Sequence, residues 1–269
     1  PTVWMGLLAW CERNGRTLTR LRRCVIGGSA CPPAVIEQFR KHHGVEVKHA
    51  WGMTEMSPLG TVNSLKPRLA RLTSAEKLPV QSKQGRPVFG VELKIVDADE
   101  RELPHDGQTF GLLKVRGPWV CSSYYASDSP GDAHDAAGWF ATGDVATIDP
   151  DGYLQITDRA KDVIKSGGEW ISSIDLENLA VAHPAVAEAA VIAMPHPKWQ
   201  ERPLLVVVLA PGASATREEL LAWFDGKVAR WWIPDDVAFV TSLPHTATGK
   251  ISKRDLRTQI AGAVPAAGG

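Results

Sequence analysis

Several candidate ligand-binding residues lie in one segment, residues 138–172 of the 269-residue chain. Asp144, in a short Thr-Gly-Asp loop, could accept hydrogen bonds from both hydroxyl groups of a ribose, as acidic residues do in dinucleotide sites. Arg159 follows closely and could reach the same ribose. Gly167 and Gly168 would let another molecule approach the backbone, because neither has a side chain. Together they indicate nucleotide chemistry at a joint between two domains.

Further candidates lie outside this segment. Thr54 and Glu55 follow a predicted strand and a glycine, where a hydroxyl beside a carboxylate can hold a phosphate oxygen and Mg²⁺. Trp51, just before them, could stack on a purine base. Lys250 lies on a Thr/Gly loop that is too polar to be buried without a partner. It could bring positive charge to a phosphoryl or carboxylate oxygen.

Each candidate also has an ordinary structural interpretation. The acid could cap a turn, and the arginine could be a surface charge. The tryptophan could pack in a core, and the Thr-Glu pair could lie on a solvated loop. The lysine could be an exposed side chain and the paired glycines a plain turn. The order and spacing of the whole set, rather than any one member, favour a nucleotide site.

The elements that must position these residues begin with an α/β pattern. Strand, glycine loop, helix and strand alternate over residues 21–55, and a site is then expected at the carboxyl ends of the strands. The expected elements are a helix over residues 2–12, a strand over 21–26, a helix from the Pro32-Pro33 pair to His43, and a strand over 45–50.

The middle of the chain has a different pattern of polar and apolar residues. Residues 64–84 are polar and basic without a clear period and predict a surface loop. Short strands separated by turns then predict an antiparallel sheet or a small barrel over residues 85–157. Pro150 and Gly152 favour a hairpin turn between the last two strands. The strands are expected at residues 91–96, 111–116, 145–148 and 153–157.

A domain boundary is predicted near Lys161. Residues 158–162 carry four charges in five positions, so the chain is expected to come to the surface there. We therefore divide the sequence into residues 1–160 and residues 161–269.

The second part again mixes helices and strands. Ser172 can cap a helix that ends before Pro184, and Thr216 with Glu219 forms a capping box for another. The remaining expected elements are strands over residues 186–194, 204–209 and 237–240, a last helix over 252–260, and a disordered Ala/Gly/Pro tail.

Composition excludes several classes of protein. Thirty basic residues balance thirty acidic ones, so nothing indicates binding to nucleic acid or to an anionic membrane. No apolar run is long enough to span a bilayer, and no signal peptide is recognisable. The four cysteines lack CxxC spacing and are expected to be reduced thiols of a cytoplasmic protein. The chain begins at Pro1 rather than methionine, and we interpret it as a fragment or a processed product.

In these motifs, the chain resembles the adenylate-forming superfamily of acyl-CoA synthetases. Five blocks occur in the order typical of that family and span nearly the whole chain. They are GGSA at residues 27–30, WGMTEMSP at 51–58, GWFATGD at 138–144, DRAKDVIKSGG at 158–168 and TGK at 248–250. The KSGGEWIS and WWIP stretches, at residues 165–172 and 231–234, are most similar to medium- and long-chain fatty-acid–CoA ligases and 3-methylmercaptopropionate–CoA ligases. The KSGGEW stretch argues against a luciferase or a carrier-protein adenylation domain.

The resemblance implies a fold, a reaction and its small-molecule partners. The expected fold class is α/β (α+β, multidomain). Residues 1–160 would form α/β layers and a small β-barrel, as the end of the large AMP-binding domain, and residues 161–269 would form a mobile α+β lid. The reaction would be fatty-acid–CoA ligation in two steps, through an acyl-adenylate. ATP, Mg²⁺, coenzyme A and a carboxylic acid would take part. The oligomeric state stays open, a homodimer included.

The resemblance also implies roles for individual residues. Thr54 and Glu55 would act in catalysis with Lys250; Thr54 would contact phosphate and Glu55 would hold Mg²⁺. Lys161 would be the hinge of the lid. The residues around adenine and ribose would be Gly28, Ser29, Ala30, Trp51, Gly52, Met53, Asp144, Ile156 and Arg159, and those beside coenzyme A would be Gly167, Gly168 and Glu169. Lys198 and Arg202 could contact the phosphates of coenzyme A or be solvated loop residues.

One feature of the family is absent from this sequence. The family's phosphate-binding loop of Ser, Thr, Gly and Lys would lie upstream of the five blocks, and no such stretch occurs here. We therefore expect the chain to be the carboxyl-terminal half of a ligase, weakly active or inactive alone. The alternative is a nucleotide-binding remnant without catalysis, or a subunit of a split enzyme. The acyl chain length is not fixed, because the pocket residues would lie mainly in the other half.

Overall fold

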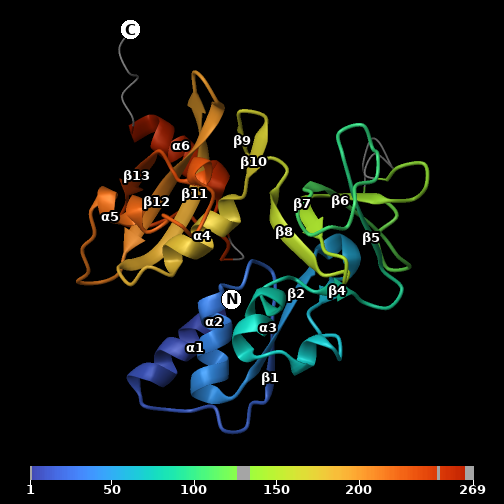
Figure 1. Cartoon of the computed structure of the whole chain (residues 1–269), viewed down its shortest axis with the longest axis horizontal. Coiled ribbons are helices and arrows are strands. Elements are labelled where there is room, and N and C mark those ends of the chain that lie inside the picture. Colours follow the sequence, from blue (N-terminus) through green and yellow to red (C-terminus); the bar gives the residue numbers. More distant parts are fainter. Residues whose placement is uncertain (1, 126–133, 247–248, 264–269) are drawn as a thin grey trace. The chain divides into compact units, whose positions relative to one another are not determined.

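The computed structural model describes residues 2–125, 134–246 and 249–263. Within it, the chain divides into two compact units, Pro1–Ala160 and Lys161–Gly269, and no sheet of the described residues includes strands of both (Figure 1).

The first unit begins with a sheet whose strand order is β1-β2-β3-β4. β1 (Arg23–Ile26) and β2 (Glu46–Gly52) are parallel, and β3 (Leu59–Val62) and β4 (Arg86–Pro87) continue the sheet in antiparallel fashion. The connection between β1 and β2 is the expected helix, formed by α2 (Pro33–Gln38) and a π-helical turn, Phe39–His43. The helix α1 (Thr2–Arg13) contributes Leu8 to the core formed with them. The α/β pattern predicted for residues 21–55 is thus present.

The prediction of a surface loop over residues 64–84 was wrong. A 3₁₀ turn spans Leu69–Arg71, and α3 spans Ser74–Gln81. No residue of α3 is buried and Pro79 lies inside the helix, so the segment has no apolar periodicity to reveal it. The available signal was the capping box. The Thr73 hydroxyl accepts a hydrogen bond from the Glu76 amide, and the Glu76 carboxylate accepts one from the Thr73 amide.

The second sheet of this unit is a meander in chain order, β5-β6-β7-β8, with all neighbours antiparallel. The strands are β5 (Glu92–Val96), β6 (Gly111–Arg116), β7 (Phe140–Ile148) and β8 (Leu154–Arg159). The predicted small barrel is not formed, because β5 and β8 do not pair with each other among the described residues. Four strands are too few to close around a filled interior. One face of the sheet instead packs on a core that includes Ile95, Leu113 and Phe140.

The sheet of the second unit has the order β10-β9-β12-β11, with β13 also paired to β12. The strands are β9 (Ile164–Ser166), β10 (Glu169–Ile171), β11 (Val186–His196), β12 (Gln200–Leu209) and β13 (Asp236–Phe239). The helices are α4 (Ser173–Val181), α5 (Arg217–Ala222) and α6 (Lys253–Ala263), and a 3₁₀ turn spans Arg230–Trp232. Both predicted caps are present, at Ser172 and at Thr216 with Glu219.

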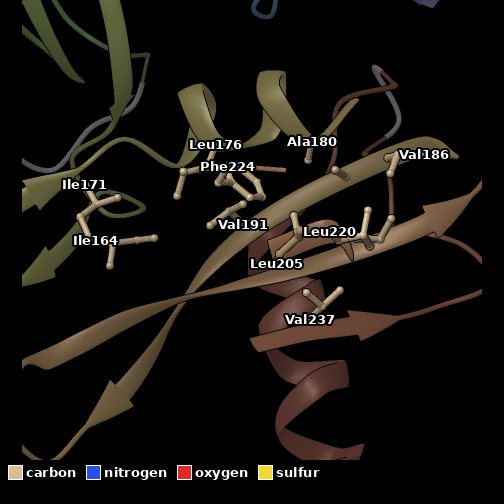
Figure 2. Close-up of a cluster of buried hydrophobic side chains, with 12 residues drawn as sticks. Ile164, Ile171, Leu176, Ala180, Val186, Val191, Leu205, Leu220, Phe224 and Val237 are labelled. Carbon is tan, nitrogen blue, oxygen red and sulfur yellow. The ribbon is translucent and has the colours of Figure 1, made fainter. Parts of the chain in front are cut away.

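Alternation along the two long strands of this sheet builds a core on each face. Val191 and Leu205 pack with Leu176 of α4 and Phe224 on one face (Figure 2). Their neighbours in sequence, such as Ile192 and Leu204, pack with Leu256 of α6 on the other face. Side chains of successive strand residues point to opposite faces, so both faces can be covered. The unit is consequently a layered α/β sandwich with helices on both sides.

The expectation that residues 158–162 come to the surface holds only in part. Arg159 and Lys161 are exposed, but Asp158 and Asp162 are 1% and 8% exposed. Burial of Asp162 is possible because Arg257 Nη2 of α6 lies 2.7 Å from its carboxylate. Asp158 accepts a hydrogen bond from the Arg159 amide at 2.8 Å. At Asp162, an arginine that is distant in the sequence compensates for the preference of a charge for water.

Two findings bear on the class of protein. Cys11, Cys24, Cys31 and Cys121 are all unpaired thiols. Among the described residues, no helix combines the length and apolar character needed to cross a membrane.

Candidate functional site

Asp144 lies at the centre of the candidate site in the first unit. Its carboxylate accepts a hydrogen bond from Trp51 Nε1 at 3.0 Å on one oxygen and from Arg159 Nη1 at 2.7 Å on the other. The carboxylate is buried, with 4% of Asp144 exposed, whereas half of the Arg159 side chain is exposed. Three residues from separate segments, all proposed from sequence as nucleotide ligands, thus meet at one carboxylate.

Strand register explains this meeting. Asp144 on β7 and Arg159 on β8 are direct partners across the ladder. The Thr-Gly-Asp segment was predicted as a loop, but it lies inside β7, where Gly143 has a positive φ of 72° and the ladder is irregular just beyond it. The buried Thr142 hydroxyl donates to the Leu113 carbonyl and accepts from the Asp144 amide. This local kink fixes the direction of the acid.

The glycine loop after β1 lies at the same sheet edge as the residues after β2. The two strands are parallel, so their carboxyl ends are neighbours. A Cβ atom on Gly27 would lie 3.0 Å from the Ala50 carbonyl oxygen, which shows how closely the loop approaches β2. Gly28 has a φ of 85°, and both Gly28 and Ser29 are exposed, whereas Ala30 is half-buried. Gly28 and Ser29 are therefore accessible from solvent at this edge.

Three of the predicted residues pack against one core. Trp51, Met53 and Ile156 are partly buried and pack against the same cluster under the β5-β6-β7-β8 sheet. Gly52 lies between the first two, and a Cβ atom there would come within 1.8 Å of the Pro58 carbonyl oxygen. Glycine is therefore required at position 52 because the chain folds back tightly after β2. The apolar side chains provide a surface suited to a base.

Thr54 and Glu55 begin a 3₁₀ turn, Thr54–Met56, directly after β2. Thr54 is exposed, and the half-buried Glu55 accepts a hydrogen bond from Tyr124 Oη at 2.9 Å. That bond raises the pKa of Tyr124, because loss of its proton would place two negative charges together. Sequence reasoning missed Tyr124, which follows Glu55 by 69 residues in no recognisable motif.

The residues around Glu55 suit one type of metal binding. No group of three or more His, Cys, Asp or Glu side chains could hold a metal among the residues that the structure describes. Mg²⁺ is commonly bound by one or two carboxylates together with substrate phosphates and water. A single carboxylate at the end of β2 therefore fits a Mg²⁺ ion that arrives with a nucleotide, rather than a dedicated protein cage.

In the second unit, Gly167 and Gly168 form the turn between β9 and β10. Their φ angles are 61° and 89°, the left-handed conformation that such tight hairpins require. The Gly167 amide donates to the Trp199 carbonyl at 2.9 Å, and a Cβ atom at Gly167 would meet the indole ring at 2.9 Å. Glu169 starts β10 and is exposed. The turn interpretation is thus correct, and both glycines are exposed to solvent.

A cavity of about 420 Å³ adjoins this turn within the second unit. Its lining residues come from the hairpin, from the β11–β12 connection and β12, and from the 3₁₀ turn and the segment after it: Ser166, Gly167, Glu169, Trp199, Arg202, Trp231 and Asp235. Trp199 and Trp231 are 42% and 43% exposed, so both indoles are partly open to a ligand. Trp199 was not singled out from the sequence, because a tryptophan more often marks a core.

Arg202 does not offer its charge to a ligand, contrary to one interpretation of the sequence. Its guanidinium nitrogens bond to the Asp235 carboxylate, to the Trp231 and Ile233 carbonyls and to the Ser166 hydroxyl. Lys198 differs, since it is exposed and its ammonium lies 4.4 Å from the centre of the Trp199 ring.

Lys250 and Lys161 are both exposed residues of the second unit, and Lys161 is its first residue. The Lys250 carbonyl accepts from the Thr246 amide at 2.7 Å, and its amide donates to the Thr246 hydroxyl at 3.2 Å. Gly249 has a φ of 78°, as a tight turn requires. Thr248, part of the TGK block, lies outside the described residues. The structure therefore places Lys250 on a bonded turn, in a different unit from Asp144.

Comparison with known proteins identifies related sequences. The sequence profile described as AMP-binding enzyme matches residues 1–125, and the profile for the AMP-binding enzyme C-terminal domain matches residues 175–250. A 3-methylmercaptopropionyl-CoA ligase of Ruegeria lacuscaerulensis is 58% identical, covering 96% of this chain and 48% of the relative. A medium-chain-fatty-acid–CoA ligase of Ectopseudomonas oleovorans is 53% identical, covering 96% of this chain and 47% of the relative.

The fold is also found among solved structures. A crystal structure of an anthranilate CoA ligase in complex with anthranoyl-AMP superposes with a TM-score of 0.82 at 30% identity. The match covers 97% of this chain and 49% of that one. The chain therefore spans about half the length of the curated relatives and of the structure that it matches.

Proposed function

The chain belongs to the adenylate-forming superfamily of AMP-binding enzymes and acyl-CoA synthetases, and we propose that it is the carboxyl-terminal half of an ATP-dependent fatty-acid–CoA ligase. The observation that carries the proposal is the contact of Trp51, Asp144 and Arg159, because residues 93 positions apart converge on one buried carboxylate. The names of relatives that are 53–58% identical support an acyl-CoA product.

The proposed reaction has two steps. A fatty-acid carboxylate attacks the α-phosphorus of ATP, forming an acyl–phosphate bond and releasing pyrophosphate. The thiol of coenzyme A then attacks the acyl carbon, forms the thioester, loses its proton and releases AMP. Each step must stabilise negative charge on oxygen, which positioned donors and cations do well in a water-poor site.

We assign the nucleotide-binding roles to the first unit. Asp144 would accept the ribose hydroxyls once Arg159, half-exposed, turns part of its hydrogen bonding to the ligand. The exposed residues Gly28 and Ser29, with Ala30, would border the adenine, as would Trp51, Gly52 and Met53, with Ile156 packing nearby. Thr54 would contact a phosphate oxygen. Glu55, oriented by Tyr124, would hold Mg²⁺, whose charge would neutralise phosphate oxygens.

We assign to the second unit the roles that differ between the two steps of the reaction. Lys250 would supply positive charge in the adenylation step, and Gly167, Gly168 and Glu169 would border the arm of coenzyme A beside the cavity. One site must first surround a polyanion and then admit a thiol, so a rearrangement between the steps is needed. Lys161, as first residue of the unit, would be the hinge. Free thiols at all four cysteines support a reducing compartment, and we propose the cytoplasm.

The test is carboxylate-dependent ATP–pyrophosphate exchange with fatty acids of graded length. It compares this chain with the chain extended upstream to the length of its relatives. We expect exchange only in the extended protein, because the family's phosphate-binding loop is not in this sequence. Lys250→Ala should lower exchange by roughly 100- to 1000-fold. It should leave thioester formation from supplied acyl-adenylate nearly unchanged.

One control variant and two contrary outcomes complete this test. Lys227→Ala removes another exposed lysine of the second unit and should not affect exchange. Absence of exchange from both wild-type proteins, while ATP still binds, would instead favour a nucleotide-binding remnant or a subunit of a split enzyme. Normal exchange by the 269-residue chain alone would contradict its proposed incompleteness.

A further inference from the structure

Arg202 occupies a central position among the segments that line the cavity of the second unit. It lies on β12, its side chain is 12% exposed, and all three guanidinium nitrogens have acceptors in the protein. Nη1 donates to the Trp231 carbonyl at 2.6 Å and to the Ser166 hydroxyl at 3.3 Å. A guanidinium has five N–H groups in a fixed plane, so it can join several segments at once.

Arg202 makes more hydrogen bonds to one part of the cavity wall, residues 231–235, than to the other parts. The Gly167 turn is held to Trp199 by a backbone hydrogen bond of 2.9 Å. Arg202 holds the segment of residues 231–235 through Nη1 to Trp231, through Nη2 to Ile233 at 2.9 Å, and through Nε to Asp235 at 2.8 Å. The segment is also held at Asp235, whose amide donates to the Pro203 carbonyl at 3.0 Å and whose carbonyl accepts from Arg217 Nη2 at 2.8 Å. Arg202 therefore joins the backbone that carries the exposed Trp231 ring to Ser166 of the β9–β10 hairpin.

We propose that Arg202 is a positioning residue for coenzyme A, acting by fixing Trp231 and the Gly167 turn as two walls of one cavity. This inference rests on the proposed function, in which coenzyme A borders Gly167, Gly168 and Glu169. Arg202 itself does not touch the ligand, because its donors are already bonded. Its effect is confined to the thioester step, since every residue that it bonds belongs to this cavity or to the segment behind it.

The fold should tolerate removal of Arg202. Trp232 and Ile233 pack against the core of the second unit, so the segment remains attached after the guanidinium is lost. What is lost is the defined position of the wall. A ligand must then order that wall when it binds, which weakens binding without any loss of direct contact.

The experiment uses Arg202→Ala and Arg202→Lys in the extended protein and in the 269-residue chain. In the extended protein, the KM for coenzyme A should rise roughly 10- to 100-fold in Arg202→Ala, since small displacements of a binding wall have effects of that size. ATP–pyrophosphate exchange should stay within about twofold of wild type. Arg202→Lys should show most of the same loss, because an ammonium keeps the charge without the planar fork.

Arg217→Ala is the matched control. Arg217 also bonds this segment, at the Asp235 carbonyl and the Asp236 carboxylate, but it does not line the cavity. It should leave the KM for coenzyme A unchanged. A second measurement, calorimetric titration of coenzyme A into the 269-residue chain and its Arg202 variants, should show the same order of affinities.

Several results would overturn the proposal. They are an unchanged KM in Arg202→Ala, a wild-type KM in Arg202→Lys, or an equal rise in Arg217→Ala. An equal fall in pyrophosphate exchange would show a general structural role instead. If Arg202→Ala does not fold, Arg202→Lys decides. If wild type performs no exchange, the proposed function fails, while the titration still shows whether Arg202 shapes a site for coenzyme A.

Discussion

Asp144 of the first unit and the turn residues of the second unit are held in opposite ways. In the first unit, Asp144 is buried on a strand and already bonded to Trp51 and Arg159. In the second unit, Gly167, Gly168 and Lys250 lie on exposed turns. Strands fix a side chain in one geometry, which suits the recognition of one ligand. Turns leave backbone and side chains open, which suits groups that act at different steps of a reaction.

The largest effect on stability and on ATP binding should come from Asp144→Ala, which removes the bonded carboxylate of the first unit. The substitution leaves two donors without their acceptor. Breaking a buried ion pair costs about 3–5 kcal/mol, and the half-exposed Arg159 reduces this to about 2 kcal/mol. Denaturant unfolding of the 269-residue chain measures the loss of stability, and ATP titration of the extended protein should show weakened binding.

Asp144→Asn is the control for shape, because it keeps one oxygen acceptor and nearly the same volume. It should lose less stability than Asp144→Ala. If both variants unfold at the wild-type denaturant concentration and bind ATP normally, the site of the first unit is not preorganised in the way described.

A smaller effect is expected from Gly167→Ala, which examines the open turn of the second unit. Alanine at a positive φ destabilises by about 1 kcal/mol. At Gly167 the new methyl group would also meet Trp199 at 2.9 Å, so the indole must move. The KM for coenzyme A should rise severalfold, with little change in pyrophosphate exchange.

Gly168→Ala separates the two causes. Its φ of 89° brings the same kind of strain, but no atom lies within 4 Å of the added methyl group. It should lower the unfolding temperature similarly, and any rise in the KM for coenzyme A would come from the added methyl group itself, without a displaced Trp199. Equal KM values for the two variants would mean that the contact of Gly167 with Trp199 does not matter.

The smallest effect concerns an exposed acceptor, Asp106, which contrasts with buried Asp144. Its carboxylate accepts from the Thr109 and Gln108 amides and the Thr109 hydroxyl, which lowers its pKa from 3.8 to about 2. A lowered pKa means that the stabilisation is present above about pH 3.8 and is lost as the pH falls through about 2.

Unfolding temperatures of wild type and Asp106→Ala against pH check this expectation. The wild type should be slightly more stable at neutral pH, and the two curves should converge below about pH 2. A difference that persists at the acidic limit would assign the stabilisation to something other than the charged carboxylate.

Much of the fold could be predicted from local patterns. The Ser172 cap, the capping box of Thr216 with Glu219 and the hairpin at Gly152 each have a short-range physical cause, and each is present. The α3 helix was missed because it buries none of its residues. The burial of Asp162 was missed because its partner lies 95 residues away.

Some features of the candidate site could likewise be predicted from sequence motifs, and others could not. Motifs in the sequence pointed to Asp144 and Trp51 separately, and only the fold shows that they share a hydrogen bond. Tyr124 and Trp199 carry no motif, so their contacts with Glu55 and Gly167 depend entirely on tertiary structure. The distinction between a ligand-binding arginine and a structural one at Arg202 likewise required its acceptors.

The pair of Asp162 and Arg257 has a consequence for how the protein is made. It joins the second residue of the second unit to its last helix, across 95 residues. During synthesis, Asp162 emerges long before its partner and stays solvated until α6 has left the ribosome. Contacts between distant parts of a chain form late, because a long loop must first close. Completion of α6, just beyond Lys250, would thus be among the last events of folding, and a chain that stops short of Arg257 would have to bury Asp162 alone or leave the unit unfinished.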